Sequence, residues 1–94
     1  MSDRYNAGNG SEVVDENVKQ KIVSNCANNV YKSFGNYVVR RTEDLDGYKY
    51  FFDNEQWLLI RASGTEPVLR MYAESSTKEG AQDILEAASK TFFN

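Results

Sequence analysis

The sequence predicts an α+β domain in which one helix, four β-strands and a second helix follow one another along the chain. Apolar residues recur at three- and four-residue steps before and after the central part of the chain, which indicates the two helices. Between them, four runs rich in β-branched and aromatic residues are separated by short polar turns. Because these turns are too short to contain crossover helices, we expect a mostly antiparallel four-stranded sheet with both helices on one face.

The first fourteen residues carry no hydrophobic period and are rich in glycine, asparagine and serine. We therefore expect residues 1–14 to form a flexible tail or linker and residues 15–94 to form the domain. A chain of 94 residues has room for one such domain with a modest core. A domain cut from a longer protein at a boundary begins in this way, and so does a natural short protein with a loose end.

The first helix is expected to begin at Asp15, which is a suitable N-cap, and to end near Gly35. Gly35 suits the position after a helix C-terminus, and Lys32 would then complement the helix dipole. Cys26 falls on the apolar stripe and has no histidine to activate it, so we interpret it as a buried structural thiol. The stripe consists of Val18, Ile22, Val23, Cys26 and Val30.

Four segments have the composition of strands: 37–42, 48–52, 57–60 and 68–73. Asp46-Gly47 marks the turn between the first two, and a second turn at 53–55 leads into the third. The acidic residues of the first turn do not have calcium-loop spacing, and Arg40 and Arg41 point to opposite sides of a strand, so both groups are interpreted as solvated. Strand alternation turns the following side chains toward the helices: Leu58, Ile60, Leu69, Met71 and Ala73.

A capping box at 76–79, with Ser76 as N-cap and Glu79 three residues later, predicts the start of the final helix. Asp83 and Glu86 lie on its polar face, which disfavours binding to an anionic membrane. We therefore expect the apolar stripe of this helix to pack on the sheet. The stripe consists of Ala81, Ile84, Leu85, Ala88 and Phe92.

Composition excludes several classes of function. A net charge of −3 and a pI near 4.9 argue against a nucleic-acid partner. The chain has one cysteine, no leader segment and no apolar run long enough for a membrane span, which together favour a reducing cytoplasm. It has no histidine, so zinc-type metal chemistry and histidine acid–base catalysis are not expected from this chain alone.

The segment between the last two strands, Arg61-Ala62-Ser63-Gly64-Thr65-Glu66-Pro67, has the composition of an anion-binding loop. It combines a guanidinium group, two hydroxyl groups and a glycine that lets backbone N–H groups approach a ligand. Arg61 and Ser63 have the same strand parity and so are expected on one side, and Arg70 would add a second guanidinium group. The same residues also suit an ordinary turn, with Arg61 facing water.

This heptad, followed by Arg70, Tyr72 and Glu74, resembles the C-terminal domain of the α-D-phosphohexomutases, the phosphoglucomutase and phosphomannomutase family. The likeness in element order extends from about residue 15 to the end of the chain. It implies a TATA-box-binding-protein-like α+β fold, without implying DNA binding. It also implies that the loop binds the phosphate group of a hexose phosphate. The implied phosphate-binding residues are Arg61, Ser63, Gly64, Thr65 and Arg70.

The resemblance further implies that this domain belongs to a four-domain enzyme that interconverts hexose 1-phosphate and hexose 6-phosphate. In that family a phosphoserine in the first domain transfers phosphate, an aspartate loop in the second binds magnesium, and a loop in the third recognises the sugar. We find no counterpart of these motifs in the 94 residues, so we expect no catalytic residue, metal ligand or cofactor here and no activity from the domain alone. Magnesium and the choice among glucose, mannose and glucosamine phosphates would depend on other domains.

Two other functions stay open at this point. The chain would be a stand-alone, non-catalytic module that captures phosphorylated partners if its gene encoded only this domain. Alternatively, it would be a structural domain whose loop is a plain turn. The length of the parent open reading frame separates these, because several hundred upstream residues would support the mutase.

Overall fold

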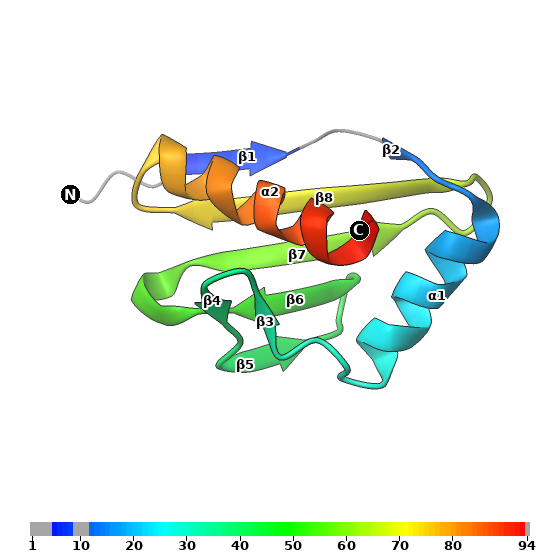
Figure 1. Cartoon of the computed structure of the whole chain (residues 1–94), viewed down its shortest axis with the longest axis horizontal. Coiled ribbons are helices and arrows are strands. Elements are labelled where there is room, and N and C mark those ends of the chain that lie inside the picture. The colour runs from blue at the N-terminus through cyan, green and yellow to red at the C-terminus, as the bar shows by residue number, and fades with distance from the viewer. Residues whose placement is uncertain (1–4, 9–11, 94) are drawn as a thin grey trace.

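The computed structural model of the chain describes residues 5–8 and 12–93 and has the expected α+β architecture. Two helices, α1 (Glu16–Ala27) and α2 (Lys78–Phe93), accompany an antiparallel sheet and a small hairpin (Figure 1). The hairpin pairs β3 (Ser33–Phe34) with β4 (Tyr37–Val38), and a 3₁₀ turn, η1, covers Asp53–Glu55. The main sheet contains β1 (Tyr5–Gly8), β2 (Glu12–Val13), β5 (Arg41–Glu43), β6 (Tyr48–Phe51), β7 (Trp57–Ala62) and β8 (Val68–Ser75).

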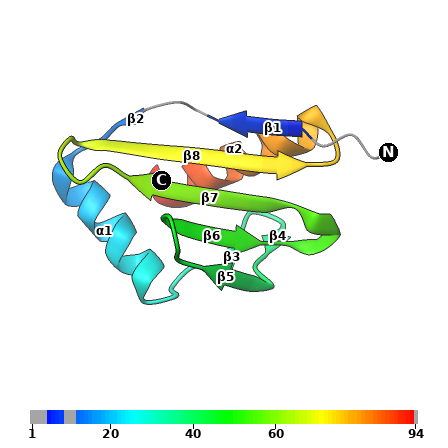
Figure 2. The same ribbon diagram turned by 180° about the vertical axis from the view of Figure 1, so that it is seen from behind.

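Strands of the main sheet follow the order β1-β8-β7-β6-β5, and β2 pairs with the other end of β8. Every pairing is antiparallel, as expected from the short connections. Figure 2 shows the molecule from behind, where α2 lies beyond the strands of the sheet. Helix α2 therefore covers one face of the sheet, and the opposite face is turned away from this helix. The sheet has six strands in the described part of the chain, which is two more than the sequence predicted.

The two additional strands come from the segment expected to be a flexible tail, residues 1–14. In its described part, β1 pairs with β8 from Tyr5 opposite Ser75 to Gly8 opposite Tyr72, and β2 pairs with Val68 and Leu69. This pairing joins backbone groups and needs no hydrophobic period, which is why a polar, glycine-rich segment can supply it. Residues 1–4 and 9–11 lie outside the described part, and the division into linker and domain stays a prediction.

Helix α1 begins as expected but ends eight residues before Gly35. Its N-cap is Asp15, whose Oδ1 accepts a hydrogen bond of 2.8 Å from the N–H of Asn17. At the other end, the N–H of Val30 donates to the carbonyl of residue 25 and the N–H of Asn29 to that of residue 26, which is a Schellman motif. Asn29 has the required positive φ of 54°, so asparagine performs the role that the sequence analysis gave to glycine.

The corrected helix end changes the position of two predicted residues. Gly35, with φ of +60°, lies in the turn between β3 and β4. Val30 lies beyond the helix and is 53% exposed, so it does not extend the apolar stripe.

The expected strand 37–42 is two strands in different sheets. The N–H of Val39 donates to the carbonyl of Lys32 beside the hairpin, whereas the N–H of Arg40 donates to the carbonyl of Phe51 in β6. The chain therefore leaves the hairpin and joins the main sheet between these two residues. A continuous run of β-favouring residues does not reveal such a change of partner, because composition is the same on both sides of it.

The core lies between the sheet and the two helices. The five strand residues predicted to face the helices are all at most 1% exposed, which confirms the alternation. They pack with Ile22 and Cys26 of α1 and with Ile84, Leu85 and Ala88 of α2. Burial raises the pKa of the Cys26 thiol, in keeping with a structural role. Phe34 closes the cluster from the hairpin, and its ring meets that of Tyr50 edge to face at 5.0 Å between centroids.

Helix α2 begins one residue later than the predicted capping box implies. The hydroxyl of Thr77, and not that of Ser76, accepts the hydrogen bond from the N–H three residues on, at Gly80. The predicted stripe of α2 is otherwise confirmed, since Ala81, Ile84 and Ala88 are fully buried. Neither helix in the described residues has the length and apolar character needed to cross a bilayer.

Tyr37 ties the hairpin to α2, and this contact predicts a loss of stability in alkali. Its hydroxyl donates a 2.8 Å hydrogen bond to Oδ2 of Asp83. Burial, as the larger cause, and the Asp83 carboxylate, as the smaller one, together raise the pKa of Tyr37 to about 12. An unfolded tyrosine titrates near pH 10. Between about pH 10 and 12 the unfolded chain therefore loses this proton first, and the free energy of unfolding falls as pH rises.

We expect Tyr37→Phe to make that fall shallower, because phenylalanine has no proton to lose. Urea unfolding of both proteins at several values between pH 9 and 11.5 measures the slope. Equal slopes for the two proteins would contradict the assignment.

Candidate functional site

The candidate anion site lies where β7 ends and β8 begins, next to α1 (Figure 1). Strand β7 continues two residues beyond its predicted end, so Arg61 belongs to the strand and the loop proper covers residues 63–67. The N–H of Ser63 donates to the carbonyl of Val68 at 3.1 Å, and the N–H of Val68 donates to that of Glu66 at 2.7 Å. These bonds close the loop tightly at its base.

Arg61 and Arg70 are direct neighbours across the β7–β8 pair. Both are exposed on the face of the sheet away from the helices, the face that also carries Trp57 and Leu59 of β7. Like charges opposite each other on a strand pair destabilise it. In the described part of the chain no carboxylate pairs with Arg61. The register thus places the two arginines that the sequence analysis selected opposite each other on one face of the sheet.

The hydroxyl of Ser63 organises the loop backbone. Its Oγ accepts hydrogen bonds from the N–H of Thr65 at 3.3 Å and from that of Glu66 at 3.1 Å. An oxygen that accepts two bonds still has its own proton to donate, so Ser63 can act as a donor toward a ligand. Ser63 lies beyond the last residue of β7, so these loop bonds, and not the strand alternation that we used, set the direction of its hydroxyl.

Gly64 and Thr65 form the exposed tip of the loop. A Cβ atom built on Gly64 would meet no heavy atom within 4 Å, and its φ is not in the left-handed range. Neither packing nor backbone conformation therefore requires glycine at this position. The N–H of Gly64 has no acceptor among the described residues.

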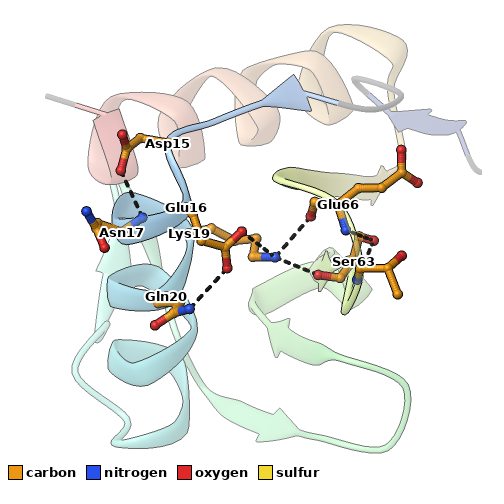
Figure 3. A network of polar contacts seen from close by, with 8 residues as sticks. Asp15, Glu16, Asn17, Lys19, Gln20, Ser63 and Glu66 are labelled. Carbon is orange, nitrogen blue, oxygen red and sulfur yellow. Dashed lines mark hydrogen bonds and ion pairs between the residues drawn. The ribbon is translucent and has the colours of Figure 1, made fainter.

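The sequence analysis missed Lys19, which reaches the loop from α1 (Figure 3). Its Nζ donates to the carbonyl of Ser63 at 2.7 Å and to that of Glu66 at 3.0 Å, and lies 3.2 Å from Oε1 of Glu16. The residue is only 6% exposed. A signal was present in the sequence, since Lys19 precedes Ile22 and Cys26 by three and seven positions and so shares their face of the helix.

Two further contacts steady the loop and its support. The N–H of Val14, just after β2, donates to the carbonyl of Pro67 at 2.9 Å. Nε2 of Gln20 donates to Oε2 of Glu16, and this bond, together with the ammonium of Lys19, lowers the pKa of the Glu16 carboxyl. The loop is thus held by α1 and by the segment next to β2.

Other charged residues lie apart from this loop. Arg40 forms two hydrogen bonds, of 3.0 and 2.9 Å, with the carboxylate of Asp53, and Arg41 stacks on the ring of Phe51. The basic pair therefore belongs to the sheet surface, as the sequence predicted. In residues 5–8 and 12–93 no group of three acidic, histidine or cysteine side chains is placed to hold a metal ion.

Two glycines near the site should differ in how much replacement by alanine destabilises the domain. Gly47 has φ of +124°, and its Cβ would lie 2.5 Å from the carbonyl oxygen of Ile60 and 2.9 Å from Cγ of Arg61. We expect Gly47→Ala to lower the free energy of unfolding by about 1–3 kcal/mol. Gly64→Ala should change it by less than about 0.5 kcal/mol, because the space is open. Urea unfolding measures both, and a Gly64→Ala protein as unstable as Gly47→Ala would contradict the described loop.

Comparison with known proteins shows that the chain is similar to part of several mutases. A probable phosphoglucosamine mutase of Methanosphaera stadtmanae is 36% identical over 87 residues, which cover 82% of this chain and 19% of that protein. The phosphoglucosamine mutase of Methanocaldococcus jannaschii is 32% identical over 92 residues, covering 84% of this chain and 20% of that protein. A phosphoglucomutase/phosphomannomutase of Thermococcus kodakarensis is 42% identical over 50 residues, covering 53% and 11%.

The chain therefore spans a fifth or less of the length of these relatives. Residues 12–91 match the family described as phosphoglucomutase/phosphomannomutase, C-terminal domain. This match includes the loop, both arginines, Lys19 and strand β2. The chain thus belongs to the phosphoglucomutase/phosphomannomutase family, as a form of its C-terminal domain.

Proposed function

We propose that this domain binds the phosphate group of a hexose phosphate, with the loop at 63–67 and the two arginines beside it. The observation that carries the proposal is the pairing of Arg61 with Arg70 next to a loop whose tip has an unoccupied backbone N–H. The site residues are those predicted from the sequence, namely Arg61, Ser63, Gly64, Thr65 and Arg70.

The chemistry of these groups favours a phosphate over a carboxylate. Two guanidinium groups, two hydroxyl groups and one backbone N–H offer more donors than the two oxygens of a carboxylate can accept. All of them recognise the phosphate and none needs a particular sugar behind it. Such a site suits a reaction in which phosphate moves between the 1- and 6-positions of a hexose, because either end of the intermediate must occupy the same place.

In this proposal the domain is the phosphate-binding part of a larger enzyme, an intramolecular phosphotransferase. Its contribution is to position the substrate and to exclude water from the cleft, while phosphoryl transfer takes place on other domains. Magnesium would likewise be held elsewhere in the parent enzyme. The relatives carry the names of both phosphoglucosamine mutase and phosphoglucomutase/phosphomannomutase enzymes. In this proposal the choice of hexose therefore depends on other domains.

Phosphate should bind weakly to the 94-residue chain, with an affinity in the millimolar range, about −4 kcal/mol. The site is exposed to water, and no sugar contact offsets the lost freedom of the ligand. Titration with inorganic phosphate, followed by amide NMR, should shift the signals of residues 63–66. Arg61→Ala should weaken binding about tenfold or more, since a hydrogen bond to a charged group contributes about 1.5–3 kcal/mol.

Arg40→Ala is the matched control, because it removes the same charge from an exposed position just before β5, where the partner of Arg40 is Asp53. It should leave phosphate affinity unchanged. Arg61→Lys should also weaken binding, since an ammonium group lacks the two-pronged geometry of guanidinium. The proposal would have to be abandoned if phosphate shifted the amide signals around Arg40 and Arg41 instead of those of the loop. It would also have to be abandoned if the loop shifts persisted unchanged in Arg61→Ala.

The chain by itself should show no mutase turnover, because it has no candidate for the transferring group. A coupled assay with glucose, mannose and glucosamine phosphates in the presence of magnesium tests this. Turnover above background that co-purifies with the chain would refute the positioning role and would require a nucleophile within these residues.

A further inference from the structure

Lys19 is an unusual residue to find between a helix and a loop, because a buried ammonium group loses favourable contacts with water. Taking such a group out of water is costly unless its hydrogen bonds are replaced. Here the replacement is complete, since the three N–H donors of the ammonium have three oxygen partners, the carbonyls of Ser63 and Glu66 and the carboxylate of Glu16. Lys19 therefore has no donor left for a ligand.

The bond to Ser63 also fixes the direction of the neighbouring amide. The carbonyl of Ser63 and the N–H of Gly64 belong to one peptide unit, and in a trans peptide these two groups point in opposite directions. The described residues contain no cis peptide bond. Figure 3 shows the ammonium of Lys19 reaching the carbonyl of Ser63, at 2.7 Å. Because Lys19 holds this carbonyl toward α1, the N–H of Gly64 in the same peptide unit points away from α1.

The N–H groups of the other loop residues are already hydrogen-bonded or absent. The N–H groups of Thr65 and Glu66 are turned onto the hydroxyl of Ser63, and the carbonyl of Glu66 is held by Lys19 in the same way as that of Ser63. The residue after Glu66 is Pro67, which has no N–H. Lys19 thus keeps two carbonyl oxygens, which would repel a phosphate, on the side of the loop that faces the helix.

We propose that Lys19 is a positioning residue of the phosphate site, which acts through the loop backbone by keeping the Gly64 N–H directed outward and two carbonyls directed inward. This inference rests on the proposed phosphate-binding function for its role. The orientation that it assigns to the loop, however, can be measured without any ligand. Glu16 assists by accepting the third bond of the ammonium.

The test compares Lys19→Met with Lys21→Met in the 94-residue chain. Methionine keeps a side chain of similar length and good helix propensity, and Lys21 is an exposed lysine of the same helix, so both variants lose one positive charge. Without phosphate, Lys19→Met should move the Gly64 amide signal and lower the NMR order parameters of the backbone at residues 63–66. With inorganic phosphate, its affinity should fall about three- to tenfold relative to the wild type. Lys21→Met should match the wild type in both measurements.

Unchanged Gly64 signals and unchanged phosphate affinity in folded Lys19→Met would overturn the inference, as would an equal loss of affinity in Lys21→Met, which would assign the effect to net charge. If the wild-type chain binds no phosphate at the loop, the proposed function fails. The ligand-free comparison of the Gly64 amide then still decides whether Lys19 orients it.

Glu16→Ala provides a second test that remains valid if Lys19→Met does not fold. It removes the acceptor of the third ammonium bond and makes the chain more positive, so a purely electrostatic effect would strengthen phosphate binding. The positioning role predicts a weaker affinity and a shifted Gly64 amide in spite of the added positive charge. Tighter or unchanged binding with an unshifted amide would overturn the inference.

Discussion

The pairing of β7 with β8 is the constraint on which both the core and the candidate site depend. Strand β8 is bonded to β7 on one side and to β1 and β2 on the other, so it lies inside the sheet along most of its length. The register that places Leu58 opposite Ala73 and Ile60 opposite Met71 on the helix side also places Arg61 opposite Arg70 on the other side. A shift of one residue would exchange the two faces, burying the arginines and exposing the core.

Most of the fold follows from periodicity, and the exceptions have physical causes. The alternation of β7 and β8 and the stripe of α2 are strong signals because each buries a complete apolar face. The end of α1, the division of the strand around Val39 and the pairing of β1 depend instead on backbone hydrogen bonds. Asn29, and not a glycine, has the positive φ that ends α1, and the polar segment that forms β1 provides the edge strand of the sheet. Backbone pairing leaves little trace in side-chain composition, which explains why these features were not predicted.

The candidate site shows the same division. The residues proposed to face the ligand belong to one short motif, so the sequence alone is enough to select Arg61, Ser63, Gly64 and Thr65 as candidates. Lys19 could not be selected by that route, because it is 44 positions from Ser63 and binds main-chain carbonyls of the loop. A lysine on an apolar stripe is ordinarily interpreted as a solvated neighbour of that stripe, since its long stem can carry the charge to water. Here the stem carries the charge to the loop.

The exposed residues of the candidate site and the buried Lys19 contribute differently to the stability of the domain. Arg61 and Thr65 are exposed and contribute little to the core, so substitutions at these positions would leave the domain folded. Lys19 is buried among helix and loop contacts, and its loss leaves a buried ammonium site unfilled as well as two carbonyls without their donor. The orientation of the loop is therefore coupled to the packing of α1 against the sheet. A domain built in this way can hold one backbone donor in a fixed direction, at a lower conformational cost than ordering exposed side chains on a flexible loop.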